Sequence, residues 1–270
     1  MKIALYLAGH LRIFNDDIIS NIKEIFNNID YDLYVSTYNL TDRKSGNGIF
    51  LTDEEIKEKF SGLPLKNIII EKDENIIKCL RCHNEAKYGP KNYVCYKTNN
   101  ITDRKTSPVY CENCTNDEYV LTKDDINVWT QWRHVNNCYK MAIESGVKYD
   151  YHVRSRPDIL IIDKIDFENL ENGKLFAGFG GGLGYPDDMF AVGKQDESWK
   201  HYCDIDKVLL HSLSAHEVTE YTFIKYPIQK HIQIAIIREP KFNEKVPGLP
   251  LQPYGENWIL MYKKEMYNRI

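Results

Sequence analysis

Short apolar runs alternate with amphipathic segments along the first quarter of the chain. Three such runs have the length and composition of strands, at residues 2–8, 31–39 and 67–71. Between them, isoleucine and phenylalanine recur at helical spacing after Asp16, and Thr52 with Glu55 forms a capping box before a short helix. This strand–helix rhythm predicts an α/β fold with a mostly parallel sheet covered by helices.

The rhythm stops between residues 72 and 119, where Asn, Lys, Cys and Tyr dominate and no period persists. It resumes with a helical pattern over 124–145 and the apolar stretch YDYHVRSRPDILII at 149–162. We therefore expect one α/β domain built from residues 1–71 and 120–270, interrupted by a cysteine-rich insertion at 72–119.

Charged residues interrupt the apolar stretch at 149–162. Arg154, Arg156 and Asp158 fall within five positions of a strand that is otherwise aliphatic. Burying unpaired charge costs several kcal/mol, so we expect the chain to leave the core here and face a ligand. One chemistry that uses a carboxylate beside cations is the binding of a nucleoside diphosphate through a divalent metal held by Asp158. The alternative is a charged pair on an exposed edge of the sheet.

Two further strand ends carry polar groups. The first strand ends in AGHLR, where Ala8, Gly9, His10 and Arg12 offer a flexible turn and a cation to a diphosphate or nucleoside. A later strand begins at the adjacent carboxylates Asp187 and Asp188, either of which could act as general base for an acceptor hydroxyl. The sequence PDD is also a common turn and helix cap.

The segment HSLSAHE offers His211, His216 and Glu217 as possible further ligands of a metal or phosphate. Histidine is more often structural than a ligand, so these three residues stay secondary candidates.

The insertion contains two C-x-x-C motifs, formed by Cys79 with Cys82 and by Cys111 with Cys114. Four thiolates complete a tetrahedral zinc site of the zinc-ribbon kind, which would hold together a segment with few apolar residues. The alternative to a structural role is a zinc-ribbon binding module that contacts nucleic acid or a protein partner. That module calls for a basic face, whereas the chain has a net charge of −4 and a pI near 6.1.

The 270 residues are 43% hydrophobic, and no apolar run approaches the length of a membrane span. The apolar run at the N-terminus is too short for a signal peptide. We expect a cytoplasmic protein with reduced thiols, in the cytoplasm of a host cell if the chain is viral, and no nucleic-acid partner.

Four stretches together resemble a known family: IALYLAGHLR, YDLYVSTYN, YDYHVRSRPDIL and YPDDMFAVG. They are similar to nucleotide-sugar glycosyltransferases of GT-A type from bacterial surface-polysaccharide and large-virus glycan gene sets. The resemblance covers residues 1–71 and 120–225, and it implies a Rossmann-like sheet. The chain departs from the family's Asp-x-Asp motif by carrying Arg156 and Asp158 at these positions.

The resemblance implies transfer of a sugar from a nucleotide diphosphate sugar to a hydroxyl acceptor, expected to be a glycan. Asp158 would hold manganese or magnesium on the diphosphate, and Arg12, Arg154 and Arg156 would offset the charge of the leaving group. Asp188 or Asp187 would take the proton of the acceptor if the enzyme inverts the sugar.

Overall fold

The computed structural model describes residues 1–41, 48–72, 121–179, 187–204 and 222–236, together with short strands between 77 and 110. Side chains are not described in those short strands, at 121–129, at Asp187 or at Ile236. Residues Met1–Ile236 form one compact unit.

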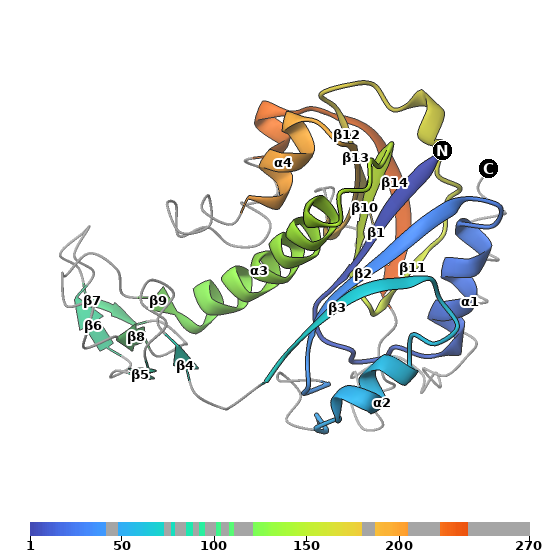
Figure 1. Cartoon of the computed structure of the whole chain (residues 1–270). Coiled ribbons are helices and arrows are strands. Elements are labelled where there is room, and N and C mark those ends of the chain that lie inside the picture. The colour runs from blue at the N-terminus through green and yellow to red at the C-terminus, as the bar shows by residue number, and fades with distance from the viewer. Residues whose placement is uncertain are drawn as a thin grey trace, which may run out of the picture. The chain divides into compact units, whose positions relative to one another are not determined.

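An eight-stranded sheet organises this unit, with the strand order β11-β14-β12-β13-β10-β1-β2-β3. The strands are β1 (Lys2–Ala8), β2 (Asp30–Tyr38), β3 (Leu65–Glu71), β10 (Tyr151–Ser155), β11 (Ile159–Ile161), β12 (Leu175–Phe179), β13 (Asp187–Lys194) and β14 (Ile228–Ile236). Figure 1 shows β1 and β10 side by side within this sheet. The predicted α/β class is confirmed.

The prediction of a mostly parallel sheet is wrong, because the sheet is mixed. β1 pairs in parallel with β2 and β10, β2 with β3, and β12 with β14. β13 is antiparallel to both of its neighbours, β10 and β12, and β11 is antiparallel to β14. β13 is antiparallel to β12 because the connection between them is short. Only residues 180–186 separate the two strands, and a parallel crossover needs a dozen residues or more.

Three helices form where the caps and the apolar spacing predict them: α1 (Asp16–Ile25), α2 (Asp53–Glu58) and α3 (Lys123–Glu144). The described residues also form α4 (Glu197–Cys203) and a 3₁₀ turn η2 (Phe167–Asn169). The capping box is present, since the Thr52 hydroxyl accepts from the Glu55 backbone and the Glu55 carboxylate accepts from Thr52. Gly146 follows α3 with φ +69°, a conformation that glycine adopts without strain.

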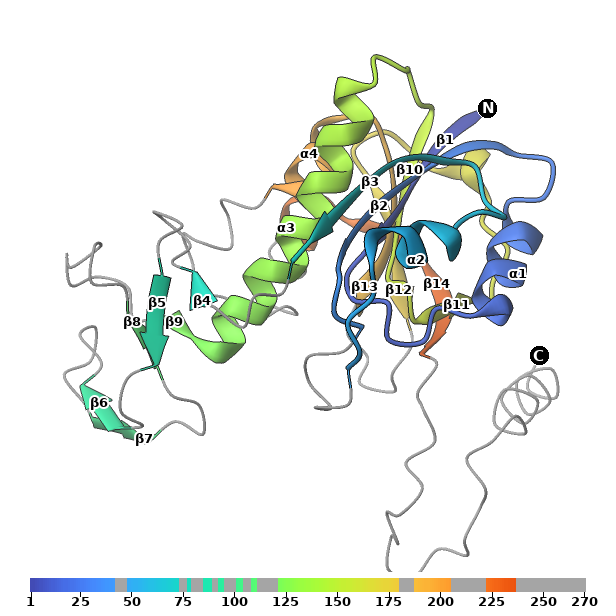
Figure 2. The same cartoon turned by 60° about the horizontal axis from the view of Figure 1, so that its bottom comes forward.

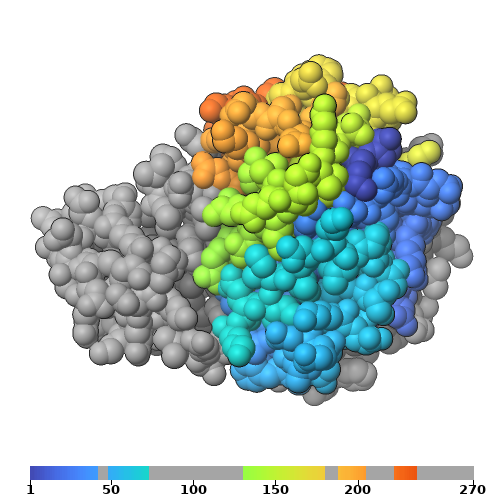
Figure 3. Space-filling view, in the orientation of Figure 1, coloured from blue at the N-terminus to red at the C-terminus, as the bar shows by residue number. Residues whose placement is uncertain are grey.

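α3 and α4 cover one face of the sheet, and α1 and α2 lie on the opposite face (Figures 1 and 2). In the space-filling view, the described part of α3 lies as a yellow-green band between α4 and the cyan α2–β3 region (Figure 3). Beneath it, large aromatic side chains fill the core, among them Trp132, Trp199, Tyr202 and Tyr6. This burial of aromatic surface is the main stabilising contribution of α3 and α4.

The strand order reverses at β1, which has β2 on one side and β10 on the other. The helix that precedes β10 is α3, which lies on the face of the sheet opposite to α1 and α2. At such a reversal the connections leave in opposite directions, and the carboxyl ends of the two strands border a crevice in which α/β proteins commonly bind ligands.

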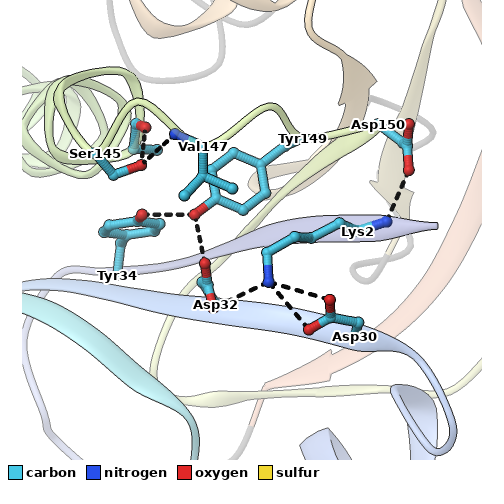
Figure 4. Close-up of polar contacts among 9 residues, drawn as sticks. Lys2, Asp30, Asp32, Tyr34, Ser145, Val147, Tyr149 and Asp150 are labelled. Carbon is cyan, nitrogen blue, oxygen red and sulfur yellow. Dashed lines mark hydrogen bonds and ion pairs between the residues drawn. The ribbon is translucent and has the colours of Figure 1, made fainter.

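The opposite, amino-terminal edge of the sheet is tied together by a polar network (Figure 4). The Lys2 ammonium lies 3.1 Å from Asp30 and 3.5 Å from Asp32. The Tyr149 hydroxyl donates to Asp32 at 2.6 Å and lies 2.6 Å from the Tyr34 hydroxyl. These contacts join β1 and β2 to the connection between α3 and β10.

The strands of the predicted insertion do not join the main sheet. They are β4 (Ile77–Lys78), β5 (Glu85–Tyr88), β6 (Asn92–Val94), β7 (Ile101–Asp103) and β8 (Pro108–Tyr110), and β9 (Leu121–Thr122), just after the predicted end of the insertion, pairs with β8. β4, β5, β8 and β9 form one small sheet, and β6 pairs with β7. None of the helices in the described part of the chain is long and apolar enough to cross a membrane.

Candidate functional site

The ends of β1 and β10 bring two predicted segments into contact. The strands run in register up to Leu7 and Ser155, and Gly9 then turns with φ +130° while its N–H donates to the Ser36 carbonyl at 3.0 Å. A Cβ at Gly9 would lie 3.8 Å from the ring of Pro157. The AGHLR and RSRPD turns therefore lie against each other at the strand-order reversal.

Asp158 is the buried centre of an ion cluster at this edge. Arg156 donates to it twice, from Nε to Oδ1 at 2.8 Å and from Nη2 to Oδ2 at 2.5 Å, and Arg12 Nη1 lies 3.9 Å from Oδ2. The side chains of Arg12 and Arg156 are 35% and 22% exposed, whereas that of Asp158 is 5% exposed. A solute that approaches this cluster meets guanidinium groups before it meets the carboxylate.

Arg154 lies in the core rather than at the ligand-facing edge that the sequence led us to expect. Its side chain is fully buried, and its guanidinium carbon lies 5.4 Å from the centre of the Trp132 ring on α3. Within the described residues none of its three guanidinium nitrogens has a hydrogen-bond partner. Guanidinium stays protonated, so a positive charge that no described carboxylate compensates sits behind the strand end.

His152 lies two residues before Arg154 and is also buried. Its Nδ1 shares a hydrogen bond with the Tyr6 hydroxyl at 2.6 Å, and its ring stacks on Trp199. Burial lowers the pKa of His152 to about 3, against a smaller opposing effect of Asp196. His152 is thus neutral near pH 7 and adds no second charge to that of Arg154.

Asp188 stands near the start of β13, beside the end of β10. The Arg156 N–H donates to the Met189 carbonyl at 3.1 Å, which joins the two segments. Asp188 is 8% exposed, and the Gln131 amide on α3 donates to its Oδ2 at 2.7 Å and to its backbone carbonyl at 3.1 Å. Gln131 therefore fixes the orientation of this carboxylate next to the Arg156–Asp158 cluster.

His10 belongs to a second polar cluster at the ends of β2 and β3. Its Nδ1–H donates to the Leu40 carbonyl at 3.0 Å, and its ring stacks on Tyr38 at 4.9 Å. Arg133 on α3 donates to the Tyr38 hydroxyl at 2.8 Å and pairs with Glu71. His10, next to the Gly9 turn, thus connects the ion cluster to the ends of β2 and β3.

Sequence reasoning did not find the residues that α3 contributes to this edge. They are Gln131, which contacts Asp188 on β13, and Arg133, His134 and Asn137, whose partners on β2 and β3 are Ser36, Tyr38 and Glu71. The signal available in the sequence was the set of polar residues that recur at helical spacing between Trp129 and Tyr139, on either side of Trp132. It was insufficient, because polar positions on a helix are ordinarily solvent-exposed.

Several predicted residues lie outside the described part of the chain. They are Cys79, Cys82, Cys111, Cys114, His211, His216 and Glu217, and the side chain of Asp187. The zinc site therefore stays a prediction. Cys138 and Cys203, which are described, are buried free thiols.

The described residues contain no group of three or more His, Cys, Asp or Glu side chains placed to hold a metal ion. Around Asp158 the nearest charged partners are arginines. What this edge offers is a donor-rich, positively charged surface, which suits an anionic ligand. No protein-family model matches the chain, and no curated protein matches it either.

Proposed function

We propose that the chain is a glycosyltransferase of GT-A type, which moves a sugar from a nucleotide diphosphate sugar to a hydroxyl group of an acceptor glycan. The observation that carries the proposal is the pair of partly exposed arginines, Arg12 and Arg156, over a buried Asp158 where the strand order reverses. This edge suits a diphosphate, because guanidinium groups bind phosphate oxygens through two parallel hydrogen bonds.

In the proposed reaction the acceptor oxygen attacks the anomeric carbon of the sugar. The bond from this carbon to the diphosphate oxygen breaks, and the nucleoside diphosphate leaves with the electron pair. Arg12 and Arg156 stabilise the negative charge that develops on it. If the enzyme inverts the sugar, Asp188 takes the proton of the acceptor hydroxyl, with its carboxylate oriented by Gln131.

The manganese or magnesium ion expected at Asp158 does not fit the contacts of the described residues. A divalent cation of this kind binds carboxylate oxygens, and both oxygens of Asp158 accept hydrogen bonds from Arg156. Bound there, such an ion would supply Lewis-acid stabilisation of the leaving phosphate. In the proposed reaction Arg12 and Arg156 provide that stabilisation, and no step passes through a metal.

A binding screen tests the donor site. Thermal shift and calorimetry with nucleoside diphosphates and their sugar conjugates should identify at least one ligand. Arg12→Ala and Arg156→Ala should each weaken its binding by about 10- to 100-fold, the value of a charge-assisted hydrogen bond. Lys66→Ala, which removes an exposed cation on β3, is the matched control and should bind normally.

The role of Asp188 requires a separate measurement. Asp188→Asn should keep donor binding and lose transfer to the acceptor by a factor of about 100 or more if Asp188 is the base. Full transfer activity in this variant would indicate a retaining reaction or another base. Absence of binding by every nucleoside diphosphate would refute the proposed function itself.

A further inference from the structure

We infer that the cluster of Arg12, Arg156 and Asp158 binds a diphosphate without a divalent cation, and that Asp158 is a positioning residue for the arginines rather than a metal ligand. This inference rests on the proposed function, because it concerns how the same site holds its donor. It differs from what the family resemblance implies for Asp158.

The hydrogen-bond geometry supports this role for Asp158. Arg156 contacts it from Nε and Nη2, so the planar fork of the guanidinium matches the two carboxylate oxygens in a bidentate pair. This pair fixes the side chain of Arg156 in one orientation. The Arg156 side chain is 22% exposed, so the oriented guanidinium can be reached by a phosphate from solvent.

The order of burial supports the same conclusion. The carboxylate is 5% exposed and lies behind side chains that are 22% and 35% exposed. A metal–diphosphate complex that arrives from solvent would have to displace a guanidinium to reach Asp158. Phosphate oxygens alone would reach Arg156 and Arg12 directly.

The charges of the described residues also suit a metal-free diphosphate. Arg12 and Arg156 carry two positive charges, and Asp158 removes one of them. Arg154 adds a buried charge near the end of β10, two residues before Arg156, and buried charges are less screened by salt than exposed ones. These four side chains sum to about +2, and Asp188 at the same edge lowers the total to about +1, so the edge keeps a net positive charge that attracts a diphosphate bridge with about one negative charge on each phosphate.

A metal bridge ordinarily uses more than one carboxylate. The position two residues before Asp158 is occupied by Arg156, and the next described carboxylate at this edge, Asp188, is held by Gln131. A positive side chain thus occupies the position beside Asp158 where a second carboxylate would be needed, and the carboxylate of Asp188 is engaged by Gln131.

The test compares nucleoside diphosphate binding with and without metal. Calorimetry would use UDP, GDP, CDP and ADP with the full chain, first in buffer passed over chelating resin and then with millimolar manganese chloride. Resin treatment in place of EDTA leaves any zinc bound by the cysteines in the protein. The dissociation constant of the best ligand should be the same within about twofold in the two buffers, a difference below 0.5 kcal/mol.

Variants separate positioning from a general structural role. Arg156→Lys keeps the charge and removes the fork, and it should weaken metal-free binding by about tenfold. Asp158→Asn should have a similar effect, and Asp158→Glu, which restores a carboxylate, should recover part of the affinity. A structural role alone would change the unfolding temperature of the Asp158 variants without this recovery of binding.

Each outcome supports or overturns the inference. Binding that appears only with manganese would overturn it and leave the proposed function standing. Equal binding in the two buffers with loss in Arg156→Lys would support it. Absence of binding in both buffers would overturn this inference together with the proposed function. The comparison on the unmodified chain decides the metal question even if a variant fails to fold.

Discussion

At the scale of single residues, burial separates side chains that look alike in the sequence. Arg154 and Arg156 are two positions apart, yet the first is fully buried against Trp132 and the second is partly exposed beyond the end of β10. β10 does end at Ser155, within the charged run, but Asp158 stays buried and the chain enters β11 of the same sheet at Ile159. The charged run could not indicate the burial of Arg154, because this side chain is covered by residues of α3, an element outside the run that comes after the insertion.

The burial of His152 predicts a pH dependence of stability. Its pKa is lowered to about 3 in the folded chain, below the ordinary value near 6.5. The unfolded chain therefore binds a proton that the folded chain excludes, and the free energy of unfolding should fall as the pH drops from about 6.5 toward 3. His152 contributes a slope in the free energy of unfolding against pH that approaches about 1.4 kcal/mol per pH unit.

Chemical unfolding at a series of pH values measures this contribution. His152→Gln should flatten the acidic part of the curve, whereas His231→Gln, a change at an exposed histidine of β14, should leave it unchanged. Equal slopes in the original chain and in the His152 variant would show that another group causes the acid sensitivity.

At the scale of elements, caps and apolar spacing predicted most boundaries to within a few residues. The expected strand at 2–8 is Lys2–Ala8, and the expected helix at 124–145 is Lys123–Glu144. The direction of β13 was not predicted, because the apolar pattern of a strand does not record whether its neighbours are parallel. Direction depends on the length of the connection, which here is the short glycine-rich segment before Asp187.

The polar network at the amino-terminal edge joins several elements and predicts a cost for breaking it. Tyr149→Phe removes the hydrogen bonds to Asp32 and Tyr34 and should lower the free energy of unfolding by about 1–3 kcal/mol. Burial, with smaller contributions from these two hydrogen bonds, raises the pKa of Tyr149, so its hydroxyl stays a donor through the neutral range.

Urea unfolding of Tyr149→Phe would measure this cost. Tyr31→Phe on β2 is the matched control, since its hydroxyl makes no hydrogen bond to a described residue, and it should change stability by less than about 0.5 kcal/mol. A loss of the same size in both variants would contradict a specific role of the network.

At the scale of the whole molecule, the sequence predicted the α/β fold class. It predicted only some of the residues that form the site. The strand ends that carry Gly9, Arg12 and Asp158 do lie together, as expected for parallel neighbours. Residues such as Gln131 and Arg133 were missed, because their approach to β13 and β3 depends on how α3 crosses the sheet. Periodicity predicts a helix and its apolar side, but not the strand end that a given polar residue will meet.

The cysteine motifs of the insertion predict a bound metal for the whole chain. Elemental analysis of the purified protein should find about one zinc ion per chain, lost on Cys79→Ser or Cys114→Ser. Cys95→Ser, a change at the cysteine between the two motifs, is the control and should keep the zinc. A chain without zinc, whose four motif cysteines react rapidly with thiol reagents, would contradict the zinc site.

The position of β1 has a consequence for how the chain folds during synthesis. β1 is made before both of its neighbours, and one of them, β10, follows only after α3 and the insertion. At about 5–20 residues per second, one edge of β1 stays unpaired for several seconds or longer on the ribosome. The unpaired backbone N–H and C=O groups of this edge, flanked by apolar side chains, can pair with other nascent chains, so expression at low temperature or with chaperones should raise the yield of folded protein.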